Sequence, residues 1–269
     1  MDEVWLDGRF VARDKAQVSI DNRGYLLGEG AFETIRLQAG RLRRWDLHRA
    51  RLTKGLSFLG LKAELDDLDG VAEALAARSG LTDGVARLTV TGGDRGGGLE
   101  PAGERGSCLL TVRPRPAKAQ AIRVAVLPDP RRAGLPSERY KLCGYGGMIE
   151  ARRVARSRNA DRAVVTGRGG ALACADCANL FWIKADRIFT PVIEVGALPG
   201  TTRAALIAAC AAEGLVIEEV AEDVSALLDA DAAFTTNAVE GIMPIARIDH
   251  QELRIDHQAI ERLTTLESG

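Results

Sequence analysis

The chain is poor in lysine: only six of its 36 basic residues are lysines, and the rest are arginines. It lacks an apolar run of the roughly 18 residues that a membrane-spanning helix needs. Its acidic start, Met1-Asp2-Glu3, lacks the basic and apolar regions of a signal peptide. Five cysteines in 269 residues do not make a disulfide framework, and an odd number cannot all pair. We therefore expect a cytoplasmic protein.

Neither sign of charge is in excess, because the chain has 36 basic and 37 acidic residues and a net charge of -1. Such a balance gives no reason to expect nucleic acid or an anionic membrane surface as a partner. Small molecules are the expected partners. The length is enough for one large or two medium domains with full cores.

The order of predicted elements indicates an α/β (α+β) fold. Short apolar runs separated by Gly and Asn predict strands near the start, including one at Val18-Ser19-Ile20. Helical spacing of apolar residues predicts helices over 45–59 and 68–78. The two prolines of 113–117 disfavour helix and suggest an extended linker. We therefore predict a small N-terminal domain, residues 1–115, and a larger C-terminal one, residues 116–269.

Lys141 differs from the other lysines in its surroundings, because segment 139–145 (Arg-Tyr-Lys-Leu-Cys-Gly-Tyr) is rich in aromatic, small and apolar residues. A lysine in such a setting loses hydration, and its neutral amine becomes available as a nucleophile toward an aldehyde. The alternative is a lysine at a strand end whose ammonium group reaches water.

Three other segments carry groups that bind anions. Gly200-Thr201-Thr202-Arg203 precedes an Ala-rich helical segment, and free N–H groups and hydroxyls at a helix start form an anion site. An ordinary Thr cap is the alternative. Segment 234–238 (Phe-Thr-Thr-Asn-Ala) ends an apolar strand. It either binds the same anion or simply forms a turn. Arg51 follows His48 by three residues on a predicted helix, where a solvated arginine is the simpler interpretation.

Two further motifs are weaker. The Gly-rich segment 92–98 lacks a following Gly-Lys-Ser/Thr and a βαβ context, so neither a P-loop nor a dinucleotide site is predicted. Arg95 within it lies either in an active-site loop or in an ordinary surface loop. Cys174-Ala175-Asp176-Cys177 has no second cysteine pair or nearby His, which argues against zinc or redox chemistry. No metal site is expected.

In this order and spacing, the segments resemble the class IV aminotransferase family over almost the whole chain. That family contains fold type IV pyridoxal-phosphate (PLP) enzymes, among them aminodeoxychorismate lyase, D-amino acid aminotransferases and branched-chain aminotransferases. The stretches that carry the resemblance are Asp21 to Arg36, His48 with Arg51, Lys141 with Tyr145, Asn179 to Trp182, Thr190-Pro191, Leu198 to Arg203, and Thr236 to Ile245.

The resemblance implies a homodimer with PLP in the cleft between the two domains. It makes Lys141 the catalytic lysine that binds PLP covalently, and it assigns the PLP phosphate to Arg51, Thr201, Thr202, Asn237 and Ala238. Phe32 and Arg95 are the expected substrate contacts, the second because a guanidinium matches a carboxylate with two hydrogen bonds.

One position departs from the family pattern. Family members have a glutamate five residues before Asn179, where its carboxylate keeps the pyridine nitrogen of PLP protonated, and this chain has Cys174 there. A charge-assisted hydrogen bond contributes about 1.5 to 3 kcal/mol, so its loss weakens the ring as an electron sink. Asp176 would share the face of Cys174 in an extended strand and is the candidate replacement, with a shorter reach.

Among the activities of the family, the resemblance favours aminodeoxychorismate lyase, which releases 4-aminobenzoate and pyruvate. The short chain and Thr236-Asn237-Ala238 ahead of Pro244 are the reasons. D-amino acid or branched-chain aminotransferase activity is the alternative, because Tyr145 and Leu198-Pro199-Gly200 are equally at home there. A member that keeps the fold without PLP catalysis is a third, for which Cys174 argues.

Overall fold

The computed structural model describes residues 2–94, 98–100, 106–130 and 135–268, without the side chains of 128–130. The chain forms two compact units. Unit 1 comprises Met1–Ala117 and Tyr140–Gly144, and unit 2 comprises Lys118–Arg139 and Tyr145–Gly269. Five residues around Lys141 thus belong to the first unit although the chain on both sides of them belongs to the second. The domain boundary expected after residue 115 stays a prediction.

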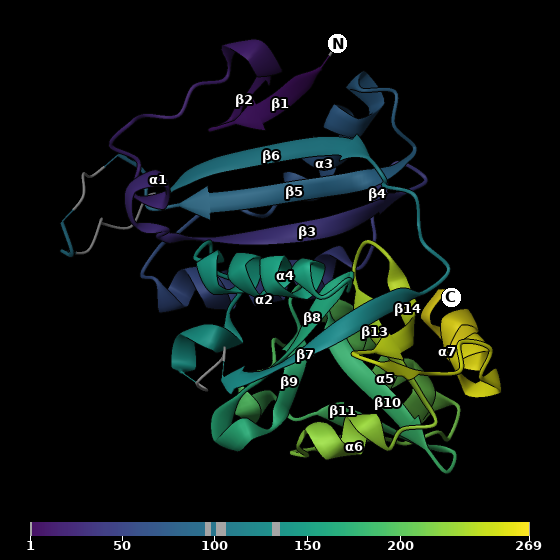
Figure 1. The fold of residues 1–269 in the computed structure, drawn as a ribbon. Coiled ribbons are helices and arrows are strands. Elements are labelled where there is room, and N and C mark those ends of the chain that lie inside the picture. Colours follow the sequence, from purple (N-terminus) through teal and green to yellow (C-terminus); the bar gives the residue numbers. More distant parts are fainter. Residues whose placement is uncertain (1, 95–97, 101–105, 131–134, 269) are drawn as a thin grey trace. The chain divides into compact units, whose positions relative to one another are not determined.

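Unit 1 is built on an antiparallel sheet of six strands in the order β2-β1-β6-β5-β3-β4 (Figure 1). Helices α2 and α3 pack on one face of it, where alternate strand residues such as Ile35 and Leu88 meet Leu52 and Leu75. The elements are β1 (Glu3–Leu6), β2 (Arg9–Ala12), α1 (Arg23–Leu27), β3 (Gly30–Gln38), β4 (Arg41–Leu42), α2 (Trp45–Phe58), α3 (Leu68–Arg78), β5 (Asp83–Thr91) and β6 (Ser107–Pro114).

Unit 2 is built on a mixed sheet of nine strands in the order β12-β11-β10-β13-β14-β7-β8-β9, with β15 beside β14 (Figure 1). Both faces are covered, since Phe181 and Trp182, adjacent in β10, belong to different core clusters. The elements are β7 (Ile122–Pro130), α4 (Gly146–Ser157), β8 (Arg162–Thr166), β9 (Leu172–Ala175), β10 (Asn179–Lys184), β11 (Arg187–Pro191), α5 (Thr201–Ala212), β12 (Ile217–Val220), α6 (Val224–Leu228), β13 (Ala232–Asn237), β14 (Gly241–Ile248), β15 (Gln251–Glu252) and α7 (Gln258–Ser268).

The mixed α+β class expected from the sequence is confirmed, and helices α2 and α3 begin and end within one residue of the predicted ranges. The strand predicted at Val18-Ser19-Ile20 is wrong, because residues 16–19 have no regular structure. Val18 and Ile20 are exposed, so neither side chain contributes to the core. Among the described residues, no helix combines the length and apolar character that crossing a bilayer requires.

Candidate functional site

Lys141 is held in unit 1 by backbone pairing with the start of β3. The N–H of Phe32 donates to the carbonyl oxygen of Lys141 at 2.9 Å, and the N–H of Cys143 donates to that of Gly30 at 2.9 Å. Residues Tyr140–Gly144 thus extend the pairing of β3 for a short distance. Because the backbone on both sides of the lysine is hydrogen-bonded, the position of its Cα is set by the sheet.

Packing reinforces this pairing. The ring of Tyr140 stacks on that of Phe58 from α2, with ring centroids 4.6 Å apart, and Leu142 packs against the core of unit 1. Residue 30 has to be a glycine, because a Cβ there would lie 2.6 Å from the carbonyl oxygen of Val90. The close approach of three chain segments at Gly30 therefore determines where the Lys141 segment lies.

The ring of Phe32 joins two cationic side chains. The Nζ of Lys141 lies 4.4 Å from the ring centroid and the Cζ of Arg87 lies 3.8 Å from it. Burial raises the pKa of the nearby Cys143 thiol, and the charge of Arg87 partly offsets that rise. The structure thus places Lys141 next to Phe32, two residues that the sequence analysis assigned to the site, and it adds Arg87, which sequence reasoning missed. The contact depends on the register of β3 and β5, which pairs Arg87 with Thr34 on the face of Phe32, and strand alternation alone does not give that register.

Arg51 lies in a buried charged cluster of unit 1 together with Glu33 and His48. Its Nε donates to Oε1 of Glu33 at 2.8 Å and its Nη2 donates to Oε2 at 2.5 Å. The Nδ1 of His48 lies 2.7 Å from the same Oε2. The side chains of Glu33 and His48 are 0% and 1% exposed. Arg51 is therefore not the solvated helix arginine of the simpler interpretation.

The protonation states of this cluster follow from its contacts. Burial by itself raises the pKa of Glu33, but the charge and hydrogen bonds of Arg51 and the contact with His48 outweigh it and hold the pKa at about 2. Burial lowers the pKa of His48; Glu33 opposes this, and the charges of Arg51 and Lys141 add to it. At neutral pH, Glu33 is therefore a carboxylate, and a neutral His48 donates its Nδ1–H to it.

In unit 2, Asn179 ties the turn before α5 to the end of β13. Its Nδ2 donates to the carbonyl oxygen of Leu198 at 2.7 Å, and Asn179 pairs with Thr236 across β10 and β13. A Cβ on Gly200 would lie 1.8 Å from the Oδ1 of Asn179. Glycine at position 200 therefore allows the amide of Asn179 to lie directly against the helix start.

The start of α5 carries uncapped N–H groups next to buried hydroxyls. Gly200 is the residue before the helix, and no side chain caps it, so the interpretation of the threonines as ordinary caps is wrong. The Oγ1 atoms of Thr202 and Thr236 are buried and have no hydrogen-bond partner within the described structure. Thr201, the first helical residue, is also buried and adjoins Thr202 in the sequence. Two partnerless hydroxyls and an uncapped helix start are suited to an anion.

The side chain of Asn237 has another role in this structure. Its Oδ1 accepts the N–H groups of Val239 and Glu240, each at 2.9 Å, and its Nδ2 donates to Glu240 at 2.5 Å. Glu240 in turn pairs with the buried Arg162. The amide of Asn237 therefore shapes the turn between β13 and β14, in which Ala238 lies. Thr236, named within the motif but not assigned to the phosphate from the sequence, has the available hydroxyl instead.

Asp176 is engaged within unit 2. Its two carboxylate oxygens accept the Nε and Nη2 of Arg152, at 2.5 and 2.7 Å, and the N–H of Ala163 at 3.0 Å. Cys174 is 5% exposed and belongs to an apolar cluster with Ala151 of α4. The thiol of Cys177, which is exposed, accepts the same Nη2 of Arg152 at 3.2 Å. Of the two residues predicted to contact the pyridine nitrogen, Asp176 is thus ion-paired and Cys174 lies among apolar side chains.

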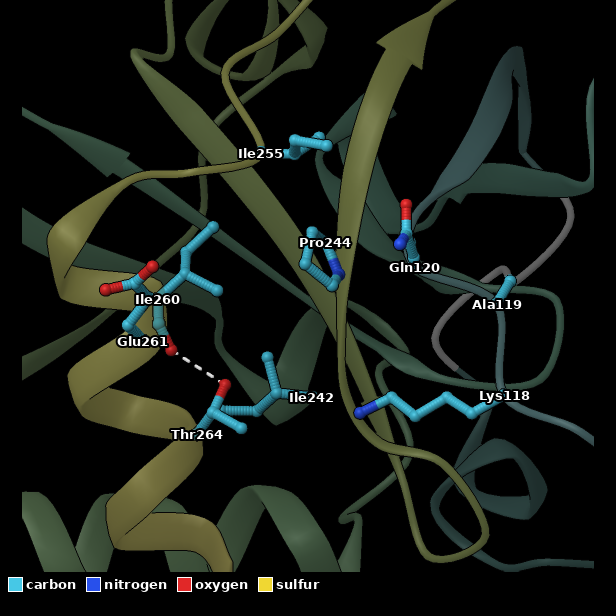
Figure 2. Close-up of a pocket in the computed structure, with 9 residues that line it drawn as sticks. All are labelled: Lys118, Ala119, Gln120, Ile242, Pro244, Ile255, Ile260, Glu261 and Thr264. Carbon is cyan, nitrogen blue, oxygen red and sulfur yellow. Dashed lines mark hydrogen bonds between the residues drawn. The ribbon is translucent and has the colours of Figure 1, made fainter.

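Arg95, the expected carboxylate ligand, lies outside the described residues. Unit 2 also contains an open groove of about 400 Å³ between β14, α7 and residues 118–120 (Figure 2). Its floor is apolar, formed by Ile242, Pro244 and Ile260. The described residues that line this groove include none of the predicted cofactor ligands, so the predicted cofactor site does not use it.

Comparison with known proteins agrees with these features. The family model described as amino-transferase class IV matches residues 30–248. D-Alanine aminotransferase of Bacillus licheniformis is 27% identical over 259 residues, which cover 93% of this chain and 90% of the relative. Aminodeoxychorismate lyase of Bacillus subtilis (strain 168) is 27% identical over 272 residues, covering 98% and 92%.

A solved branched-chain aminotransferase from Thermoproteus uzoniensis has the same fold, with a TM-score of 0.93 and 25% identity over 99% of this chain and 93% of that one. Relatives of three different activities are thus about equally similar. The family model spans both the Lys141 segment and the phosphate-binding candidates. The resemblance seen in the sequence is confirmed, and the chain belongs to the class IV aminotransferase family.

Proposed function

We propose that this chain binds PLP and uses it in an amino-acid reaction. The observation that carries the proposal is the pair of buried Oγ1 atoms, on Thr202 and Thr236, that have no partner beside an uncapped helix start. Buried hydroxyls are normally hydrogen-bonded, so this end of unit 2 fits a group with several acceptor oxygens. A phosphate is such a group, and the family uses a phosphorylated cofactor.

The roles of the chain's residues follow from their positions. Lys141 would hold the cofactor through its amine and would move the proton at the substrate Cα. Thr201, Thr202 and Thr236 hold the phosphate with backbone N–H groups at the start of α5 and at Ala238. Arg51 supplies a cation for it. PLP, when bound, supplies an aldehyde and an electron-withdrawing ring.

At the pyridine end of the cofactor we assign no carboxylate. The oxygens of Asp176 accept three hydrogen bonds from Arg152 and Ala163, and an ion pair of this kind holds the side chain in place. Cys174 lies among apolar side chains. We therefore propose that Asp176 supports α4 and β8 and that the thiol of Cys174 takes the position of the family's glutamate.

For the reaction, we propose the lyase, with release of 4-aminobenzoate and pyruvate from aminodeoxychorismate. The supporting observation is Arg87, an exposed guanidinium against the same Phe32 ring as Lys141. Aminodeoxychorismate carries a second carboxylate, for which a guanidinium is a suitable partner, whereas D-alanine and the branched-chain amino acids carry one. An aminotransferase acting on these substrates is the second candidate.

Two measurements test these proposals. Borohydride reduction of the protein with PLP, followed by peptide mapping, should place the pyridoxyl group on Lys141; label on another lysine, or no label, would contradict the cofactor proposal and favour a non-catalytic family member. Product release from aminodeoxychorismate should not need 2-oxoglutarate. Turnover that strictly requires this acceptor would identify an aminotransferase.

We also propose a homodimer. Apolar side chains are exposed along the segment before and within α1 in unit 1, namely Val18, Ile20, Tyr25, Leu26 and Leu27. Exposed large apolar residues that are close together in the sequence are candidates for a protein interface. Sedimentation of the full chain should give a dimer, and Tyr25→Asp should shift it toward monomer; a monomeric wild type at micromolar concentration would contradict the proposal.

A further inference from the structure

Arg162 is a charged residue in the interior of unit 2. It is the first residue of β8, and its side chain is 7% exposed. Its Nη1 donates to the Oγ1 of Thr235 at 3.0 Å, and its Nη2 donates to the Oε2 of Glu240. In the sheet, β14 and β7 lie between β13 and β8. Strands three places apart in a flat sheet are roughly 14 Å apart, so the sheet curves to bring Arg162 to the end of β13.

The carboxylate of Glu240 extends these contacts to Asn237. Its Oε2, which accepts Arg162, also accepts the Nδ2 of Asn237 at 2.5 Å. The Oδ1 of Asn237 accepts the N–H groups of Val239 and Glu240, each at 2.9 Å. Both ends of the Asn237 amide are therefore held. Arg162 thus holds the residue before Thr236 directly, and the residue after it through Glu240.

Thr236 lies between the two residues that this network holds, and its side chain points the other way. Successive side chains of a strand lie on opposite faces, so Thr236 points away from the face on which Arg162 meets Thr235. Its Oγ1 is buried and has no hydrogen-bond partner within the described structure. On its own face Thr236 pairs with Asn179, which lies against Gly200 at the start of α5. The network therefore holds the backbone from one face and leaves the hydroxyl on the other, toward the helix start.

The energetics of the pair favour a role in geometry over one in stability. Burying an arginine and a glutamate together contributes little to folding, because the cost of removing both charges from water offsets their attraction. Apolar residues of similar volume would fill the same space without that cost. They would not supply two donors of one planar guanidinium, which hold Thr235 and Glu240 in fixed relative positions.

We propose that Arg162 is a positioning residue that acts through Thr235 and Glu240 and orients the hydroxyl of Thr236 toward the phosphate of the cofactor. This inference rests on the proposed function, because it takes the PLP phosphate as the ligand of Thr236. An arginine that only stabilised unit 2 would influence PLP and pyridoxal alike, although pyridoxal lacks the phosphate.

The experiment compares the dissociation constants of PLP and pyridoxal for the wild type and two variants. Arg162→Lys keeps the buried charge, but its single nitrogen cannot replace the two ends of the guanidinium. The double variant Arg162→Met with Glu240→Gln removes both charges together, so that neither is left buried and unpaired. Each should weaken PLP binding about fivefold, because the Thr236 hydroxyl remains but is less well oriented. Pyridoxal binding should change less than about twofold.

Two controls separate positioning from a structural role. Arg187 also binds a glutamate of unit 2, Glu218, through two N–H groups at 2.7 and 2.5 Å, and Arg187→Lys should leave the ratio of the two dissociation constants unchanged. In a Thr236→Val background, Arg162→Lys should change PLP binding less than about twofold, since the hydroxyl that it orients is gone.

Three results would overturn the inference. They are equal weakening of PLP and pyridoxal, unchanged PLP binding in both Arg162 variants, and an undiminished effect of Arg162→Lys in the Thr236→Val background. A wild type that binds neither ligand would instead overturn the proposed function, and the inference with it.

Discussion

A buried charged cluster of unit 1 and two buried threonines of unit 2 differ in one respect. In unit 1, Glu33 and Arg51 make charge-assisted hydrogen bonds to each other, and His48 completes the shell of the carboxylate. In unit 2, Thr202 and Thr236 are equally buried, but their hydroxyls have no partner within the described structure. The first set uses its hydrogen-bonding capacity within the protein, and the second set leaves it available.

This difference indicates what each set contributes. A buried ion pair with all its hydrogen bonds made is costly to break, because removing one partner leaves the other charge buried and unpaired. A partnerless buried hydroxyl already costs free energy in the absence of a ligand, and binding recovers that cost. We therefore expect substitutions in the unit 1 cluster to change stability strongly, and substitutions of the unit 2 hydroxyls to change ligand binding with little effect on stability.

The largest effect is expected for Arg51→Met. It leaves the Glu33 carboxylate buried without its main partner, which should lower the free energy of unfolding by about 3 to 5 kcal/mol. Arg49→Met is the matched control, since Arg49 lies on the same helix in an exposed pair with Asp66 and should cost less than about 1 kcal/mol. Urea unfolding measures both; a similar loss for the two variants would remove the contrast between buried and exposed pairs.

Acid should remove the contribution of the same cluster to stability. Folding lowers the pKa of Glu33 from 4.5 to about 2, so its contribution is present above pH 4.5 and is lost as the pH falls toward 2. Linkage gives about 3 kcal/mol for this loss. His48, whose pKa is also lowered, acts in the same direction below pH 6.5, because only the unfolded chain takes up its proton. Urea midpoints between pH 3 and 7 should fall less steeply in Glu33→Gln; parallel curves would contradict the assignment.

A smaller effect is expected at Gly200, where a Cβ would lie 1.8 Å from the Oδ1 of Asn179. Gly200→Ala should lower the free energy of unfolding by about 1 to 3 kcal/mol, as overpacking does, and Asn179→Ser should relieve part of this loss. Gly70→Ala is the control, because position 70 lies within α3 with open space around it, and it should be neutral or stabilising. No relief in the double variant would mean that the crowding arises elsewhere.

Local patterns predicted the elements better than the partners. The spacing of Leu52 and Leu56 was enough to predict α2, whereas the aromatic and apolar neighbours of Lys141 only set it apart from the other lysines. The pairing of Asp176 with Arg152 could not be predicted in this way, because strand alternation places a side chain on a face without saying which helix residue meets it. Likewise, the contact of Arg87 with Phe32 depends on how β3 and β5 pair, and the sequence of one strand alone does not give this register.

Strand β14 shows another limit of local patterns. It begins at Gly241, which has φ +67°, and contains Pro244, and both residues are unfavourable in a strand. Its apolar residues Ile242 and Ile245 are buried by neighbouring strands and by α7. Tertiary packing therefore overrides the local preference.

The smallest stability effect, and the one that contrasts most clearly with that of Arg51→Met, is expected for Thr202→Val and Thr236→Val. Valine has the shape of threonine without its hydroxyl. Removing a buried hydroxyl that has no partner deletes no hydrogen bond, so unfolding free energies should stay within about 1 kcal/mol of the wild type or rise. PLP binding should nevertheless weaken about tenfold for each variant, because each hydroxyl donates to a charged phosphate in the proposed site.

Thr190→Val is the matched control for this pair. Thr190 is equally buried in unit 2, but its hydroxyl donates to the carbonyl oxygen of Leu180 at 2.8 Å. Losing that bond should cost about 1 kcal/mol or more, and PLP binding should be unchanged. Losing the hydroxyl of Thr190 should therefore lower stability but not PLP affinity, whereas losing that of Thr202 or Thr236 should lower PLP affinity but not stability. If Thr202→Val and Thr236→Val instead destabilised the protein as Thr190→Val does and kept full PLP affinity, their hydroxyls would be structural, and the contrast with the Glu33 cluster would be lost.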